Sequence, residues 1–267
     1  MVTLSSRLAA PLGGCALLLA ASWPAQAQTA TPAASGAFAI QANFTAQTMT
    51  TELGPVANAA GSAPPAYDVV KVLSSYDQSI AVPPLVPNAV PVAASFTAEA
   101  QGIRSEAASA GIQIDFVNAG ASSSVGSASL VISQSFPPSP ASLLLAYLNV
   151  NATNVATSAS YSKVFPQTVS VSGSASFGSL SIGGSLLGGE SVSYAGTAPA
   201  NTILFQSATV TITANQQSIA YLISCSLACK LTPTRIIVHG LDIQLTNALI
   251  NGFPVTGEIV LGDASAQ

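Results

Sequence analysis

The sequence holds few side chains that could carry chemistry. His239 is the single histidine, and ten acidic residues are spread over a chain of 267 residues. A glycosidase needs two carboxylates that face each other across a cleft, about 5 or 6.5–9.5 Å apart. Such a pair would have to form in the fold, from acids far apart in the chain: Glu52, Asp68, Asp77, Glu99, Glu106, Asp115, Glu190, Asp242, Glu258 and Asp263.

His239 lies in the alternating run from Ile237 to Leu245. The strand period of two puts it on the apolar face of that run and puts Asp242, the nearest carboxylate, on the opposite face. We therefore predict that His239 is structural and not a catalyst. The motifs G-x-S-x-G, H-E-x-x-H, the P-loop and the dinucleotide fingerprint are absent from the sequence, as is a D-x-D calcium pattern. These observations predict a non-enzymatic protein with no catalytic residue and no cofactor.

Two cysteines, Cys225 and Cys229, remain once a predicted signal peptide containing Cys15 is removed. An even count in an oxidising compartment favours a disulfide, which at this spacing would pin a hairpin turn. The alternative is a metal site, but zinc needs three or four protein ligands and His239 supplies at most one more. We predict a Cys225–Cys229 disulfide and no metal site.

The amino terminus predicts export. Arg7 precedes an apolar run, Leu8 to Ala21, and an A-x-A site at Ala25-Gln26-Ala27. This pattern is typical of a secretory signal, residues 1–27, cut after Ala27; an uncut membrane anchor is the alternative. No later segment approaches the ~20 apolar residues of a spanning helix. We expect a secreted protein in the periplasm, at the cell surface or in the medium, with no membrane span in the mature chain.

The composition excludes two classes of protein. Hydrophobic residues make up 49% of the chain and charged residues 6%, with a net charge of −4. A nucleic-acid binder needs a basic patch to neutralise phosphates, and a charged disordered tail needs more charge and less apolar content.

The rest of the chain is patterned as strands. Residues 28–35 are a linker rich in Ala, Thr and Pro, and 36–267 form a single β-rich domain. In the first run, apolar residues from Phe38 to Phe44 alternate with polar ones, and Gly and Pro separate many such runs. This predicts an all-β antiparallel sandwich or barrel-like sheet fold. A β-solenoid is the lesser alternative, suggested by the Ser/Gly alternation from Ser170 to Gly196.

Three segments carry more specific predictions. Residues 98–110 could form a helix, although Gly102 argues against it, and the proline-rich run 82–91 predicts an extended loop. In the strand from Ile236 to Leu245, the period of two puts Ile237, Leu241, Ile243 and Leu245 on one buried face with His239.

Four segments resemble the choice-of-anchor P family of bacterial exported proteins: GAFAIQA (36–42), APANTILFQSATVTITANQQ (198–217), TRIIVHGLDIQL (234–245) and GEIVLGDASAQ (257–267). The resemblance implies an exported β-rich domain of unknown activity and supplies no catalytic residue.

The leading functional hypothesis is therefore an exported, non-enzymatic β-domain with a structural or adhesive role and an unknown surface or extracellular partner. One alternative is a secreted hydrolase whose carboxylates meet only in the fold. Another is a module that binds glycans or small ligands through its tyrosines: Tyr67, Tyr76, Tyr147, Tyr161, Tyr194 and Tyr221.

Overall fold

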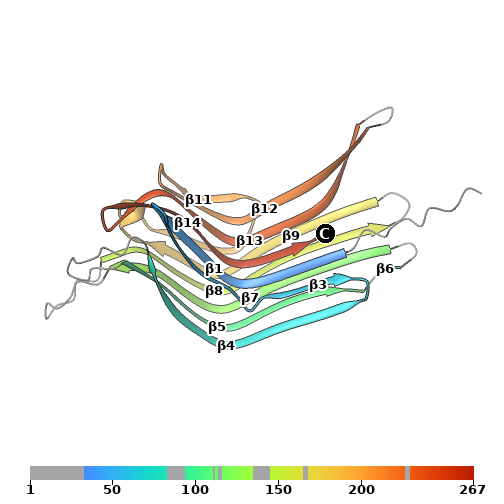
Figure 1. Cartoon of the computed structure of the whole chain (residues 1–267), viewed down its shortest axis with the longest axis horizontal. Coiled ribbons are helices and arrows are strands. Elements are labelled where there is room, and N and C mark those ends of the chain that lie inside the picture. The colour runs from blue at the N-terminus through green and yellow to red at the C-terminus, as the bar shows by residue number, and fades with distance from the viewer. Residues whose placement is uncertain are drawn as a thin grey trace, which may run out of the picture. The chain divides into compact units, whose positions relative to one another are not determined.

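Two antiparallel sheets make up the fold (Figure 1). The structure is a computed structural model that describes residues 33–82, 94–110, 112–113, 116–134, 145–164, 168–225 and 229–267. The predicted signal peptide, linker residues 28–32 and the proline-rich run at 83–91 lie outside the described residues.

Sheet 1 joins the two ends of the described chain, because the first strand pairs with the last one. Its strands lie in the order β11-β12-β13-β14-β1-β2, and β3 also pairs with β1. Their bounds are β1 Ala33–Ala46, β2 Met49–Val56, β3 Ala59–Ala63, β11 Thr202–Gln206, β12 Val210–Cys225, β13 Cys229–Ile250 and β14 Phe253–Ala266.

Sheet 2 is built from the middle of the chain. Its strands lie in the order β10-β9-β8-β7-β5-β4, and β6 pairs with β7. Their bounds are β4 Tyr67–Val82, β5 Ala94–Ser109, β6 Ile112–Gln113, β7 Phe116–Gln134, β8 Leu145–Val164, β9 Thr168–Gly183 and β10 Val192–Ala198. A single 3-10 turn, η1 (Ser185–Leu187), stands between β9 and β10.

The sandwich prediction is confirmed, and neither sheet closes into a barrel. The stretch that suggested a solenoid forms β9 and β10, which are antiparallel neighbours. The possible helix at 98–110 is wrong, because this segment is most of strand β5. Strand β1 begins at Ala33, so residues 33–35 of the predicted linker belong to a strand.

A row of Gly and Asn residues crosses the middle of sheet 2. In β7, Val117 through Val125 are buried at odd positions, whereas Ala128, Leu130 and Ile132 are buried at even ones. The pairing register between β5 and β7 is the same on both sides of Gly126, so no residue is inserted there. The strand instead turns over at Gly126, and the side chains that face inward change from odd-numbered to even-numbered positions. The neighbouring strands switch at the residues beside it: Gly102 (φ 62°), Asn154 (φ 47°) and Gly178.

Sheet 1 carries the same kind of row. It consists of Asn215 in β12, Gly240 in β13, Gly262 in β14 and Ala39 in β1. Asn215 and Gly262 have left-handed backbone, with φ values of 50° and 72°. Such conformations favour Gly and Asn, which explains these residue types within strands. We call these two rows of residues, one in each sheet, the break row. The strands of both sheets bend near the middle of their length (Figure 1).

The core is divided at the break row. The larger cluster holds the aromatic pair Phe44 and Phe96, whose ring centroids are 5.3 Å apart, together with Leu241, Ile243 and Leu261. The smaller cluster, on the other side, is built largely from Ala and Val and includes Ile236 and Val238. Both clusters fill the space between the two sheets.

The break row corrects the predicted faces of β13. Ile236 and Val238 point inward on one side of Gly240, and Leu241, Ile243 and Leu245 point inward on the other side. Ile237 and His239 are only half-buried and share the outer face. The prediction that Ile237 and His239 lie on the buried face with Leu241 is therefore wrong, because the period of two does not continue through Gly240.

We expect Gly240→Ala to lower the free energy of unfolding by about 1–3 kcal/mol. A Cβ at this position would lie 2.5 Å from Thr157 Oγ1 of sheet 2 and 2.8 Å from the backbone oxygen of Leu261. Gly183→Ala is the matched control, because a Cβ there meets nothing within 4 Å. Urea unfolding of the two variants measures the difference; equal stabilities would contradict the close approach of the sheets at Gly240.

Candidate functional site

Four ionisable side chains gather on the outer face of sheet 1 beside the break row. His239 pairs across the ladder with Asp263, and Asp242, three residues beyond His239, pairs with Val260. Glu258 of β14 pairs with Gln244 of β13. In a regular strand, an odd-numbered and an even-numbered residue such as His239 and Asp242 point to opposite faces. Because the inward face changes at Gly240, His239 and Asp242 instead point to the same face.

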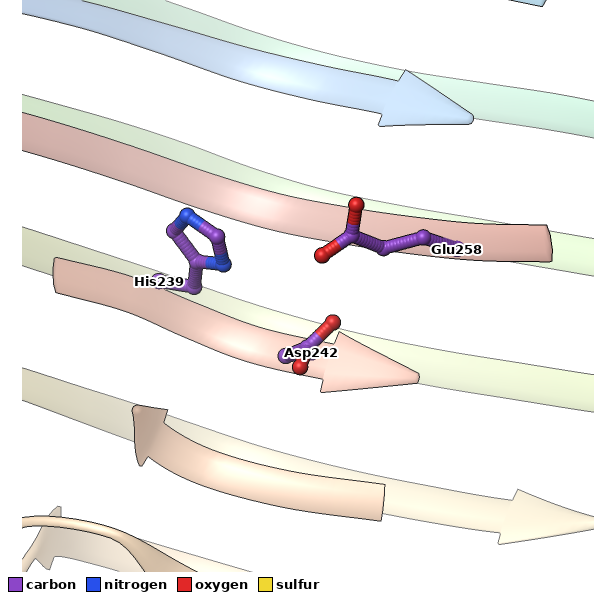
Figure 2. Close-up of side chains that lie close together, drawn as sticks. All are labelled: His239, Asp242 and Glu258. Atoms are coloured by element: carbon purple, nitrogen blue, oxygen red, sulfur yellow. The ribbon is translucent and has the colours of Figure 1, made fainter. Parts of the chain in front are cut away.

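Figure 2 shows His239, Asp242 and Glu258 directed toward one another. One ligand atom from each lies within 4.8 Å of the other two. On the far side of the imidazole ring, His239 Nε2 is 3.3 Å from Asp263 Oδ1. We call these four residues the polar cluster.

Asp242 is the most buried member, with 1% of its surface exposed. Its Oδ2 accepts a hydrogen bond of 2.8 Å from Gln244 Nε2. Two buried atoms of the cluster, Asp242 Oδ1 and His239 Nδ1, have no hydrogen-bond partner among the described residues. Leaving buried polar atoms unpaired costs free energy, so the arrangement is one that a further ligand would stabilise.

Burial governs the charges of the polar cluster. It raises the pKa of Asp242 to about 7, with a further rise from the Glu258 charge. Burial also raises the pKa of Asp263 to about 7, opposed by Arg235. Burial lowers the pKa of His239. At neutral pH the His239–Asp263 contact therefore involves a neutral imidazole, and the carboxyl favours the tautomer with its proton on Nε2.

The prediction that His239 has no carboxylate on its face is wrong. The sequence contained one signal, a glycine in the interior of a strand, which is typical of an irregularity in the ladder. Three of the ten acids belong to the polar cluster. Of the others, Asp68, Asp77, Glu99 and Glu106 lie on β4 and β5 of sheet 2, Glu52 lies on β2, and Glu190 lies between η1 and β10. Asp115 lies outside the described residues.

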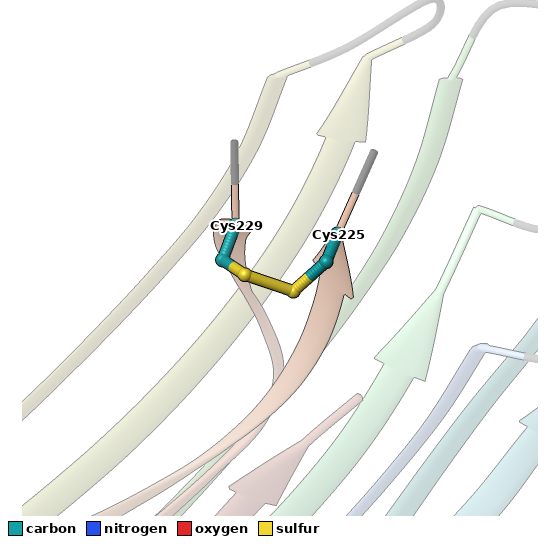
Figure 3. The surroundings of a disulfide bond; sticks show 2 residues. All are labelled: Cys225 and Cys229. Atoms are coloured by element: carbon teal, nitrogen blue, oxygen red, sulfur yellow. A yellow bond between two sulfur atoms is a disulfide. The ribbon is translucent and has the colours of Figure 1, made fainter. Parts of the chain in front are cut away.

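The predicted Cys225–Cys229 disulfide is confirmed (Figure 3). The two cysteines pair across the ends of β12 and β13, with Cα atoms 4.1 Å apart. A disulfide is compatible with an exported protein, because thiols stay reduced in the cytosol of most organisms. No helix among the described residues is long and apolar enough to cross a membrane.

The disulfide tips a two-stranded ribbon that extends beyond the sheet (Figure 1). We call residues 218–225 and 229–235 the arm. Strand β11 pairs with β12 only up to Ala214, and β14 pairs with β13 only down to Ile236. The described strands of the arm therefore pair only with each other.

Large apolar side chains of the arm face solvent. Ile223 and Leu231 are direct cross-strand partners and are 64% and 60% exposed. Tyr221, on the same face as Ile223, is 53% exposed, and Leu222 on the other face is 61% exposed. Such a group of exposed apolar side chains is a candidate interaction surface.

The chain matches no family model, and no curated protein is significantly similar to it. The resemblance to the choice-of-anchor P family stays a prediction.

Proposed function

We propose that the mature chain is an exported, non-enzymatic β-domain with a structural or adhesive role, and that it assembles with further copies of itself through the arm. The observation that carries this proposal is the exposed apolar pair Ile223 and Leu231 on a disulfide-tipped ribbon. A disulfide at the tip limits fraying of a ribbon whose described strands pair only with each other, so the apolar face stays ordered for docking.

A second copy is the partner that best fits the charge of the arm. The arm contains Lys230 and Arg235 and no acidic residue, whereas the rest of the mature chain has ten acids against Lys71, Arg104 and Lys163. Opposite net charges on arm and body favour association between copies.

The β4 edge of sheet 2 is a suitable receptor. Strand β4 is the last strand of its sheet and is 16 residues long, with Val72 65% exposed. Long open edges pair readily with strands from other chains. A contact between the arm of one copy and the edge of the next is head-to-tail, so repeated copies would form rings or open chains.

The hydrolase hypothesis has one observation in its favour, the approach of Asp242 and Glu258. A glycosidase must let its substrate reach both carboxyls. Asp242 is 1% exposed and is held by Gln244, so the geometry favours a buried structural pair. A glycan site built on tyrosines has less support, because Tyr147 and Tyr161 are buried in the core.

Sedimentation velocity of the mature chain tests the proposal. We expect reversible association at micromolar to millimolar concentrations, weakened about tenfold or more in the double variant Ile223→Ser, Leu231→Ser. The matched control is Leu249→Ser, since Leu249 is 63% exposed on β13 at the opposite end from the arm. A wild-type chain that stays monomeric throughout, or equal weakening in the control, would refute assembly through the arm.

A further inference from the structure

The polar cluster has the donor set of a metal site. His239 and Asp242 come from β13 and Glu258 from the neighbouring β14, and their ligand atoms lie within 4.8 Å of one another. Nitrogen and oxygen ligands lie about 2.0–2.2 Å from a zinc ion, so two of them are at most about 4.4 Å apart. The three side chains are therefore close enough that a small inward movement would let them share one ion. In Figure 2 one ring nitrogen of His239, the one next to the side-chain attachment, points toward the carboxyls.

Two unpaired atoms give an independent indication. Asp242 Oδ1 and His239 Nδ1 are buried and lack hydrogen-bond partners within the described ranges. The Asp242 side chain is almost fully buried, with 1% exposure, so water does not readily satisfy it. Unpaired oxygen and nitrogen lone pairs on neighbouring side chains are what a bound cation would occupy.

Asp263 completes the arrangement behind the histidine. Its Oδ1 lies 3.3 Å from His239 Nε2, the nitrogen on the other side of the ring. A carboxylate in that position fixes the tautomer and leaves Nδ1 free to bind a metal, as is general for ligating histidines. Asp263 would thus be a positioning residue and not a ligand.

We propose that His239 Nδ1 and the carboxylates of Asp242 and Glu258 bind one Zn²⁺ ion. Mixed nitrogen and oxygen ligands suit zinc, whereas Ca²⁺ and Mg²⁺ prefer sites made of oxygen alone. Two carboxylates balance the ion's charge. The ion would link β13 to β14 beside Gly240 and Gly262, the point where the break row interrupts the ladder, so its role is to stabilise the sheet.

The first test is a titration of chelator-treated, metal-free mature protein with Zn²⁺ by isothermal titration calorimetry. We expect saturable binding of one ion per chain. We also expect Tm to rise by about 5–10 °C when free Zn²⁺ is a hundredfold above Kd. Absence of saturable binding up to millimolar Zn²⁺ would overturn the proposal.

Variants locate the ion. Asp242→Asn, which keeps size and an acceptor for Gln244, and Glu258→Gln should each abolish the Zn²⁺-induced rise in Tm. Asp263→Asn should weaken binding about 10–100-fold. The control Asp77→Asn changes an exposed acid on β4 and should bind like the wild type. Equal binding by Asp242→Asn and the control would refute the site, provided that circular dichroism shows both to be folded.

X-ray absorption of the zinc-loaded protein distinguishes this site from the cysteines. We expect nitrogen and oxygen neighbours only, at about 2.0–2.2 Å. A sulfur neighbour at about 2.3 Å would place the ion at Cys225 and Cys229 and overturn the assignment. The site is independent of the arm, so its failure leaves the proposed assembly standing.

Discussion

Replacing Leu241 with Asn is expected to lower the free energy of unfolding by about 3–6 kcal/mol, much of the stability of a typical domain. Leu241 has no exposed surface and lies in the larger core cluster, between Ala214 of β12 and Leu261 of β14. The change removes the burial of an apolar side chain and buries an amide among aliphatic groups. Chemical denaturation of the variant measures the loss.

Leu249→Asn is the matched control, because it makes the same substitution on the same strand at a side chain that is 63% exposed. We expect a change within about 0.5 kcal/mol. A loss in Leu241→Asn no larger than in the control would mean that β13 is not a buried element of the sandwich.

The metal-free protein is expected to be more stable at pH 5 than at pH 8, by about 2–4 kcal/mol. The pKa of Asp242 and that of Asp263 rise from 3.8 to about 7 in the folded state. The folded state therefore holds these protons more tightly than the unfolded state does. The resulting stability is fully present below about pH 4, is lost as the pH rises toward 7, and changes little above that.

His239 acts in the opposite direction. Burial lowers its pKa, so it favours the unfolded state as the pH falls below the ordinary value of 6.5. The two carboxyls change the free energy of unfolding more than the one imidazole does, so the protein is still expected to be more stable at pH 5 than at pH 8. The other charged groups that act on these carboxyls are Glu258 and Arg235.

Urea unfolding at a series of pH values, with chelator present, checks this prediction. Asp242→Asn should be more stable than the wild type at pH 8 and should lose about half of the pH dependence. Stability that stays constant or rises from pH 5 to pH 8 in the wild type would show that the pKa values of the two carboxyls are not raised in the folded state.

Much of the fold follows from local patterns in the sequence. The alternation from Phe38 to Phe44 corresponds to β1, in which Ile40, Ala42 and Phe44 are buried. The Cys225–Cys229 spacing corresponds to the disulfide that closes the β12–β13 hairpin. Both features depend on residues a few positions apart, where the strand period and the reach of a disulfide decide the outcome.

The polar cluster depends on contacts that local patterns do not encode. A period of two carried through Gly240 puts His239 and Asp242 on opposite faces, and only the switch there brings them together. A single glycine in a strand is ambiguous; the switch becomes evident when Gly240 lies beside Asn215 and Gly262 in neighbouring strands. Likewise Asn154 lies in the interior of one strand, β8.

The sequence patterns also did not predict which strands pair with each other. Strand β1 lies between β14 and β2, so the ladder joins Asn43 to Glu258, more than two hundred residues away. Non-local pairs of this kind follow from the complementarity of whole strands and not from any motif. The polar cluster itself lies on the β13–β14 hairpin, which places Glu258 and Asp263 beside β13.

The central claim is that the break row puts Asp242 on the outer face beside His239 and Glu258 in a buried setting. A carboxyl-carbon NMR titration of Asp242 in the metal-free protein tests it most directly. We expect a pKa of about 7 for Asp242, which falls when Glu258 is replaced by Gln because the neighbouring charge is removed. A pKa near the ordinary value of 3.8 that is unchanged in Glu258→Gln would contradict the account.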